Sequence, residues 1–187
     1  MHDSIATWHE EHANFSRLLD LLEDQAKAFQ DGDPVNYELM ADIVQYLGSF
    51  GDRVHHLRED AAYARLVQKD PGMTPLIRRL LQEHRVIGIA GQELRERLDE
   101  AVDDVMFPRA TLEAAIATYL TFYRSHLLAE ECQVLPQAAN LLSPQDWDRI
   151  WRTVPRLPDP LFGETVQEGF LELRRQIERE PRPQRPA

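Results

Sequence analysis

The sequence has a single cysteine, Cys132, so it contains no internal disulfide framework. It also lacks any apolar run near the roughly 18 residues that a membrane span requires. The amino terminus has no basic stretch followed by an apolar region, which is the pattern of a signal peptide. These absences predict a protein of the cytoplasm that has no membrane partner.

Positive charge is scarce, because 21 Lys and Arg residues stand against 32 Asp and Glu residues, for a formal net charge of −11 at pH 7. An acidic chain is repelled by the phosphates of nucleic acids and by anionic membrane surfaces. The composition therefore predicts no nucleic-acid partner. Hydrophobic residues make up 43% of the 187 residues, which is enough to bury the core of one domain.

Strand-type alternation is also missing, and four long segments carry the spacing of amphipathic helices instead. The segments cover about 4–29, 35–68, 74–101 and 108–142. Gly and Pro residues at 31–34 and 70–72 separate the first three segments. Four long helices joined by short loops predict an all-α, up-down-up-down four-helix bundle over residues 1–142.

The residues after the fourth segment predict a C-terminal helical extension over 143–180. Ser143 and Pro144 suit the N-cap and first turn of a short helix, and a second helix is predicted from about 162 to 180. The tail, 181–187, is predicted to be disordered because its composition cannot form a core. Aromatic side chains of the extension either cap one end of the bundle or form a homodimer contact: Trp147, Trp151, Phe162 and Phe170.

Each predicted bundle helix carries a histidine on its apolar stripe. On the first helix, for example, His12 lies between Trp8 and Phe15 in the stripe. One histidine in such a stripe is more often an ordinary core or rim residue, but one on each of four helices is hard to obtain by accident. The four histidines are His12, His55, His84 and His126.

Two of these histidines have a carboxylate four residues later, Glu59 after His55 and Glu130 after His126. This spacing stacks two side chains on one helix face, one turn apart. Ionisable groups from all four helices would then converge on one core, where an unpaired polar or charged group costs several kcal/mol. A pair of metal ions would supply the compensating charge. Imidazole with carboxylate suits iron, manganese or zinc rather than calcium.

The order His, HxxxE, His, HxxxE on four successive helices resembles the hemerythrin-like, or HHE cation-binding, family. The likeness covers about 5–142 and includes the segments WHEEHANFSRLLDLLEDQ, HHLREDAAYARL, LLQEHRVI and FYRSHLLAEECQVLP. In this family the two carboxylates usually bridge two irons, often together with an oxo or hydroxo group. The resemblance implies a non-haem di-iron site with metal ligands at His12, His55, Glu59, His84, His126 and Glu130.

The third helix departs from the oxygen-carrying members of the family, which place a second histidine four residues after the first. This chain has Gly88 at that position, so the site is one protein ligand short of the oxygen-carrier set. Either water completes the shell or a nearby residue does. His56 is the first candidate for an additional ligand, with a rim role as an equal alternative, and Glu131 is a weaker candidate.

An open coordination position would bind a small diatomic or peroxide ligand, namely oxygen, nitric oxide or hydrogen peroxide. One hypothesis is therefore a ligand-binding protein. The alternatives are a di-iron enzyme with catalase-like, peroxidase-like or NO-reducing activity, and an iron storage or delivery protein. The missing ligand favours reactive chemistry over stable oxygen carriage, but the sequence does not decide whether the chain is an enzyme. Manganese or zinc in place of iron also stays open.

Two smaller features have alternative interpretations. Gly48 and Gly51 either thin the wall beside His55 and admit a small molecule, or they serve close helix packing. Tyr123, one turn before His126, is more simply a core residue than a hydrogen-bond donor or redox-active phenol near the metals.

Overall fold

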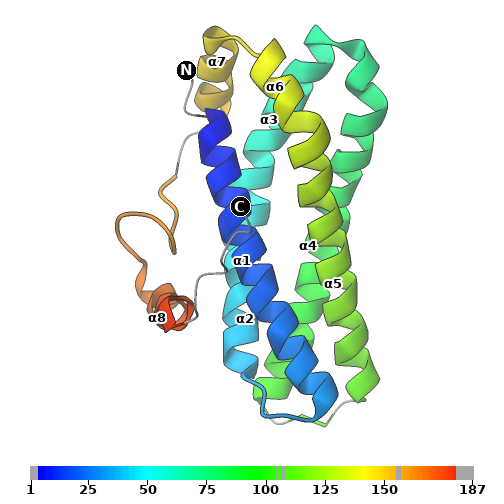
Figure 1. The fold of residues 1–187 in the computed structure, drawn as a ribbon, viewed down its shortest axis with the longest axis vertical. Helices are drawn as coiled ribbons and strands as arrows, with labels where there is room; N and C mark the ends of the chain where they lie inside the picture. The colour runs from blue at the N-terminus through cyan, green and yellow to red at the C-terminus, as the bar shows by residue number, and fades with distance from the viewer. Residues whose placement is uncertain (1–3, 104, 107, 155–156, 180–187) are drawn as a thin grey trace, which may run out of the picture.

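The computed structural model describes residues 4–103, 105–106, 108–154 and 157–179. The helices of residues 4–141 form four long columns, and Figure 1 shows that columns consecutive in the sequence run antiparallel. The first and third columns are the single helices α1 (Ser4–Asp31) and α4 (Thr74–Val102). The second and fourth are composite: α2 (Tyr37–Tyr46), η1 (Leu47–His55) and α3 (His56–Lys69), then α5 (Arg109–Ala129), η3 (Glu130–Val134) and α6 (Leu135–Leu141). The predicted all-α, up-down-up-down bundle is confirmed, and the described residues contain no strand.

The columns close into a four-sided bundle, because α1 packs against α2 and α5, and α4 packs against the same two helices. Its apolar interior falls into two clusters. The upper cluster, at the α7 end in Figure 1, includes Trp8, Tyr63 and Leu80. The lower cluster includes Phe15 and Tyr123. The bundle therefore has a break in its apolar core between Trp8 and Phe15.

The second column is not the uniform α-helix predicted for 35–68, because η1 is a π-helical segment. Along most of this column, buried positions recur every three or four residues, but the buried pair Phe50 and Gly51 is followed five residues later by the buried pair His55 and His56. The backbone N–H of His56 donates to the carbonyl of Gly51, which is the hydrogen bond of a π turn. In the fourth column, the N–H of Leu135 likewise donates to the carbonyl of Glu130 in η3. Such π turns occur frequently at functional sites, and here η1 ends at His55 while η3 begins at Glu130.

The extension packs against the bundle. Helix α7 (Pro144–Thr153) begins with a capping box between Ser143 and Asp146, and its Trp147 meets Trp8 edge-on at 5.6 Å. Trp147 thus covers one end of the bundle. The rings of Phe162 and Phe170 instead lie edge-on to Tyr46 of α2, at 5.8 and 5.7 Å. A homodimer contact stays a prediction.

The last helix starts later than predicted. After a 3-10 turn, η4 (Glu168–Phe170), helix α8 runs over Leu171–Arg179 and packs beside α2 (Figure 1). Residue 162 is not helical because the Asp159 side chain accepts the backbone N–H groups of Leu161 and Phe162 and so forms a turn. The helix end at 180 and the tail predicted to be disordered lie outside the described residues. The division into bundle and extension stays a prediction.

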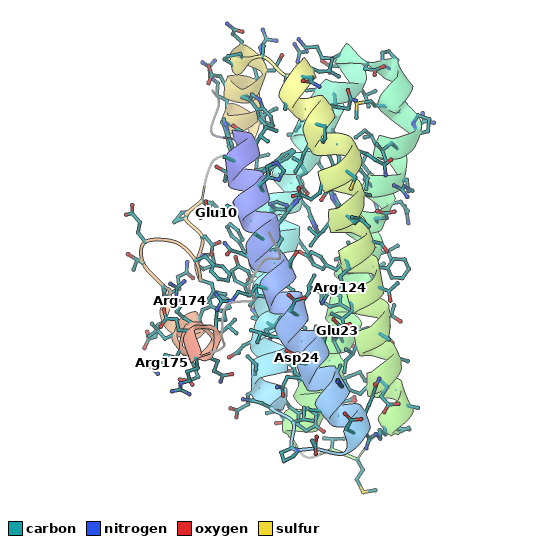
Figure 2. All side chains as sticks on the ribbon, in the orientation of Figure 1. Glu10, Glu23, Asp24, Arg124, Arg174 and Arg175 are labelled. Atoms are coloured by element: carbon teal, nitrogen blue, oxygen red, sulfur yellow. The ribbon has the colours of Figure 1, made fainter. Side chains whose placement is uncertain are left out.

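The outer faces of the bundle carry charged side chains. Figure 2 shows Arg124 of α5 facing α1, where it pairs with Asp20 and Glu23 at 2.8 Å each. Within the described ranges, no helix is long and apolar enough to cross a membrane.

Candidate metal centre

A layer of histidine and carboxylate side chains occupies the break between the upper and lower clusters. The structure brings together all the side chains that the sequence singled out as ligands, along with His56. They form two groups in which one donor atom from each residue lies within 4.8 Å of the others. The first group is His12, His55, Glu59 and Glu130, and the second group is His56, Glu59, His84 and His126.

The Nε2 atoms of the histidines meet in pairs. The Nε2 atoms of His12 and His55 are 3.0 Å apart, and those of His84 and His126 are also 3.0 Å apart. Each pair joins residues from two different columns. The bundle thus aims ring nitrogens from all four columns at one layer.

The two carboxylates lie between the histidine pairs. Glu59 Oε1 is 2.8 Å from His55 Nε2, and Glu59 Oε2 is 3.5 Å from His84 Nε2. Glu130 Oε2 is 3.5 Å from His12 Nε2, while its Oε1 is 3.3 Å from His126 Nε2. Each carboxylate therefore reaches histidines of both groups, which is the arrangement that a bridging ligand needs.

Every histidine of the layer turns its Nδ1 atom towards another carboxylate. This leaves Nε2 as the nitrogen available to the layer. The hydrogen bonds of His12, His55, His84 and His126 also hold those rings in one orientation, as outer carboxylates do for metal-binding histidines. The Nδ1 partners are Glu131 for His12 at 2.7 Å, Glu11 for His55 at 2.6 Å, Asp60 for His84 at 2.8 Å, Glu83 for His126 at 3.1 Å and Asp52 for His56 at 3.4 Å.

Most of these supporting residues are not indicated by the sequence pattern. Glu131 was considered only as a weak ligand candidate, yet it faces His12 Nδ1 and also pairs with His9 at 2.7 Å. Tyr63 was not singled out, although its hydroxyl donates a hydrogen bond to Glu130. Tyr63 lies one turn after Glu59, and this spacing was the signal that could have found it.

A buried arginine supports the first group. Arg58 is 2% exposed and donates two hydrogen bonds to Glu11, at 2.7 and 2.6 Å. Its guanidinium also lies over the ring of Trp151 in α7, 5.6 Å from the ring centre. A series of contacts, from Trp151 to Arg58, then to Glu11 and His55, links the extension to the layer. Nothing in the local sequence pattern indicates these contacts between distant segments.

The two carboxylates of the layer have opposite pKa shifts. Burial would raise the pKa of Glu59, but the charge of His55 and the hydrogen bonds from His12 and His55 lower it well below its ordinary value. Burial, together with the neighbouring charge of Glu59, raises the pKa of Glu130 well above its ordinary value. Two negative charges are not tolerated side by side in this interior without a compensating cation.

The histidines also differ. Burial lowers the pKa of His12, but its hydrogen bonds to Glu131 and Glu59 outweigh burial and raise that pKa to about 9. The pKa of His84 is raised to about 9 in the same way, by Asp60 and Glu59 against burial. Burial and the charge of His84 lower the pKa of His56 well below its ordinary value. Protons on His12 and His84 therefore supply positive charge that a metal would supply when bound.

Four buried atoms of the layer form no hydrogen bond with the described residues: Glu59 Oε2, Glu130 Oε2 and both ring nitrogens of His56. Buried polar atoms are normally paired, and coordination of a metal would satisfy the two carboxylate oxygens and His56 Nε2. The mixed nitrogen and oxygen donors suit iron, manganese or zinc rather than calcium. The residues present therefore fit a metal pair.

Comparison with known proteins gives one match. The model of the hemerythrin HHE cation-binding domain matches residues 3–138, a range that contains both groups of donors. No curated protein matches the chain, and no solved structure does.

Proposed function

Because the chain belongs to the hemerythrin HHE cation-binding family, we propose that it is a non-haem di-iron protein that binds a small ligand at an open coordination position. One observation carries the proposal: two four-residue donor groups adjoin in the core and share Glu59. Each group offers four donors, so an octahedral iron would keep a position open for oxygen, nitric oxide or peroxide. The proposed ligands are His12, His55, Glu59, His84, His126 and Glu130, with His56 as a seventh.

His56 is proposed as a ligand rather than a rim residue for three reasons. Its side chain is 3% exposed, and its ring stacks on that of His84 at 4.1 Å with the two planes 7° apart. Its Nδ1 atom faces Asp52, as the other histidines face their own carboxylates. His56 would then supply, from the second column, the imidazole that Gly88 does not supply from α4.

Bound iron would supply the redox and ligand-binding chemistry. The protein would hold the ions and limit what reaches them. Glu59 and Glu130 would keep the two ions together, and the carboxylates at Nδ1 would hold the imidazole rings in place. The upper and lower clusters close the layer above and below with apolar side chains, which exclude bulk water.

An enzyme with catalase-like, peroxidase-like or NO-reducing activity is the second candidate. The hydrogen bond from the Tyr63 hydroxyl to Glu130 favours it, because this donor lies directly beside a proposed bridging carboxylate and can supply a proton there. Iron storage or delivery, manganese or zinc as the physiological metal, a homodimer and a cytoplasmic location stay predictions from the sequence.

The test is metal analysis of protein purified without added metal, combined with its absorption spectrum. We expect one iron for each donor group and a near-ultraviolet band typical of an oxo-bridged pair. Glu59→Ala should lose the iron and the band while circular dichroism still reports a helical protein. Glu10→Ala, a change at an exposed position on α1 (Figure 2), is the matched control and should keep both. Full iron in the Glu59→Ala protein, or no transition metal in the unaltered protein, would refute the proposal.

A further inference from the structure

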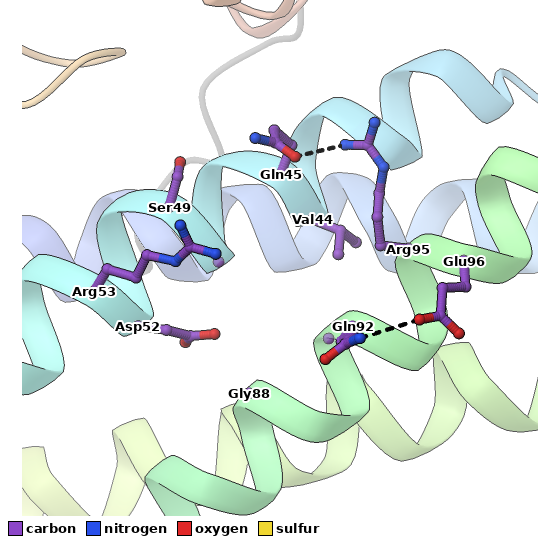
Figure 3. Close-up of a pocket in the computed structure, with 11 residues that line it drawn as sticks. Val44, Gln45, Ser49, Asp52, Arg53, Gly88, Gln92, Arg95 and Glu96 are labelled. Carbon is purple, nitrogen blue, oxygen red and sulfur yellow. Dashed lines mark hydrogen bonds between the residues drawn. The ribbon is translucent and has the colours of Figure 1, made fainter.

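A cleft of about 410 Å³ opens between α2–η1 and α4 (Figure 3). Its rim is polar, with Gln45 and Arg53 on one side and Gln92 on the other. Its inner wall includes Gly88, the position that lacks the histidine of oxygen carriers, one turn from His84. The cleft therefore approaches the second group from outside the bundle.

Two glycines keep the cleft open. A Cβ atom at Gly48 or Gly88 would meet only the Asp52 carboxylate, at 4.0 and 3.8 Å respectively. Gly51 is different, because a Cβ atom there would lie 2.5 Å from the Tyr123 hydroxyl. Of the two roles considered for these glycines, close helix packing applies to Gly51, and leaving space for a small molecule applies to Gly48.

Asp52 lies where the cleft meets the metal layer. Figure 3 shows its carboxylate pointing from η1 into the space beside Gly88. The side chain is 19% exposed, and its Oδ1 atom is 3.4 Å from His56 Nδ1. That oxygen forms no hydrogen bond with the described residues although it is buried. The other oxygen, Oδ2, is the one nearest Gly48 and Gly88, so the Asp52 carboxylate faces the metal layer with one oxygen and can accept a hydrogen bond in the cleft with the other.

Two buried tyrosines lie behind glycines next to this end of the cleft. Tyr119 and Tyr123 are both 0% exposed, and their hydroxyl groups have no hydrogen-bond partner among the described residues. The rings are 5.5 Å apart, and the ring of Tyr123 is 5.9 Å from that of His56. The ring of Tyr119 lies behind Gly91, which lines the cleft. Unpaired buried polar atoms normally mark a place for ordered water or a polar ligand.

A second groove, of about 1000 Å³ between α1 and α5, also reaches the layer at His12. Two of its charged groups are already paired, however. Glu131 faces His12 and His9, and Arg124 bonds to acidic residues of α1. Glu131, the acidic group of this groove that adjoins the layer, is therefore engaged, whereas Asp52 Oδ1 beside the cleft forms no hydrogen bond with the described residues.

We propose that the cleft admits hydrogen peroxide to the centre and that Asp52, Tyr119 and Tyr123 bind it on the way. Hydrogen peroxide donates and accepts hydrogen bonds, so a carboxylate and two hydroxyls suit it. Oxygen and nitric oxide gain little from such groups. The inference rests on the proposed function, because the iron pair is the destination of the ligand.

The first experiment blocks the cleft at Gly88. Stopped-flow mixing with hydrogen peroxide measures the rate at which the absorption band of the iron-loaded protein changes. We expect Gly88→Leu to slow this rate about tenfold or more, and Gly88→Ala to slow it only slightly, because access through a narrow opening depends on its size. Ala13→Leu, at an exposed position in the second groove, is the matched control and should react at the unaltered rate.

An unaltered rate in Gly88→Leu, or an equal slowing in Ala13→Leu, would overturn the proposal. If Gly88→Leu binds less iron, Gln92→Trp replaces it, since Gln92 is exposed at the rim and its side chain donates a hydrogen bond to Glu96. A normal peroxide rate in Gln92→Trp would equally overturn the cleft as the entrance.

The second experiment tests the ligand class. Tyr119→Phe and Tyr123→Phe remove one hydroxyl each and keep the ring. We expect both to slow the peroxide reaction several-fold while nitric oxide binding stays within about twofold, because only peroxide loses a hydrogen bond. Equal effects on both ligands, or none, would contradict peroxide as the preferred ligand.

A metal-free crystal structure separates failure of this proposal from failure of the proposed function. Ordered solvent bonded to Asp52 and the two tyrosine hydroxyls is expected even if the protein binds no iron. A dry inner end would overturn the polar site whatever the metal content. Solvent there in a protein that never binds iron would overturn the proposed function and, with it, the peroxide route.

Discussion

The two donor groups share a carboxylate but differ in how their histidines are held. In the first group, the Nδ1 bonds of His12 and His55 measure 2.7 and 2.6 Å. In the second group, the corresponding distances lengthen from 2.8 Å at His84 to 3.4 Å at His56. Shorter hydrogen bonds to ionised partners are the stronger ones. The first group is therefore held more tightly.

The surroundings of the first donor group are also more enclosed than those of the second. Glu11, behind the first group, is 10% exposed at its side chain and is fixed by Arg58, which α7 covers through Trp151. Asp60, behind the second group, is 40% exposed, and Asp52 borders the open cleft. We infer a division of labour in which one side of the centre retains metal and the other admits ligand.

The largest expected effect tests a feature that the groups have in common. Each contains one histidine whose pKa is raised to about 9, His12 in the first group and His84 in the second. At pH 7 both carry a proton that a metal must displace, so lowering the pH below 9 should weaken zinc binding about tenfold per pH unit for each displaced proton. A pH indicator in weak buffer measures the proton release during zinc titration. Release of a single proton would show that the two groups differ in this respect, and no proton release would contradict the raised pKa values of His12 and His84.

A matched pair of substitutions tests the difference between the groups. Loss of an outer carboxylate typically costs 10–100-fold in metal affinity. We expect Glu11→Gln to approach about 100-fold and Asp60→Asn to stay near about tenfold, since water can replace an exposed carboxylate more readily than a buried one. Competition with a coloured chelator measures both affinities. Equal losses would show that the depth of the outer carboxylates does not distinguish the groups.

The smallest effect concerns the glycines beside the second group. Gly51→Ala should destabilise the protein by about 2 kcal/mol, because the new methyl group displaces the buried Tyr123 ring. Gly48→Ala should instead stabilise it by about 0.5 kcal/mol, since Ala has the better helix propensity and its methyl group would meet only the Asp52 carboxylate, at 4.0 Å. Urea unfolding of the metal-free proteins gives both free energies. A similar cost at the two positions would contradict the assignment of Gly48 to the cleft.

The outline of the fold was predictable because it depends on periodicity. Four amphipathic stripes and two loop signals indicate the bundle, and the same stripes place His12, His55, His84 and His126 on inner faces. The π turns were missed, since a step of five buried positions is a small change in a long pattern. The late start of α8 was missed because one side chain, Asp159, accepts the N–H groups that a helix would have used.

The sequence by itself therefore placed four histidines, Glu59 and Glu130 on the inner faces of the bundle, since spacing along a helix decides which face each residue occupies. Only the tertiary structure decided how they meet. The sharing of Glu59 between two groups, the carboxylate behind each histidine and the cleft at Gly88 all arise between residues of different columns. Contacts of that kind depend on the packing of the columns, which no local pattern records.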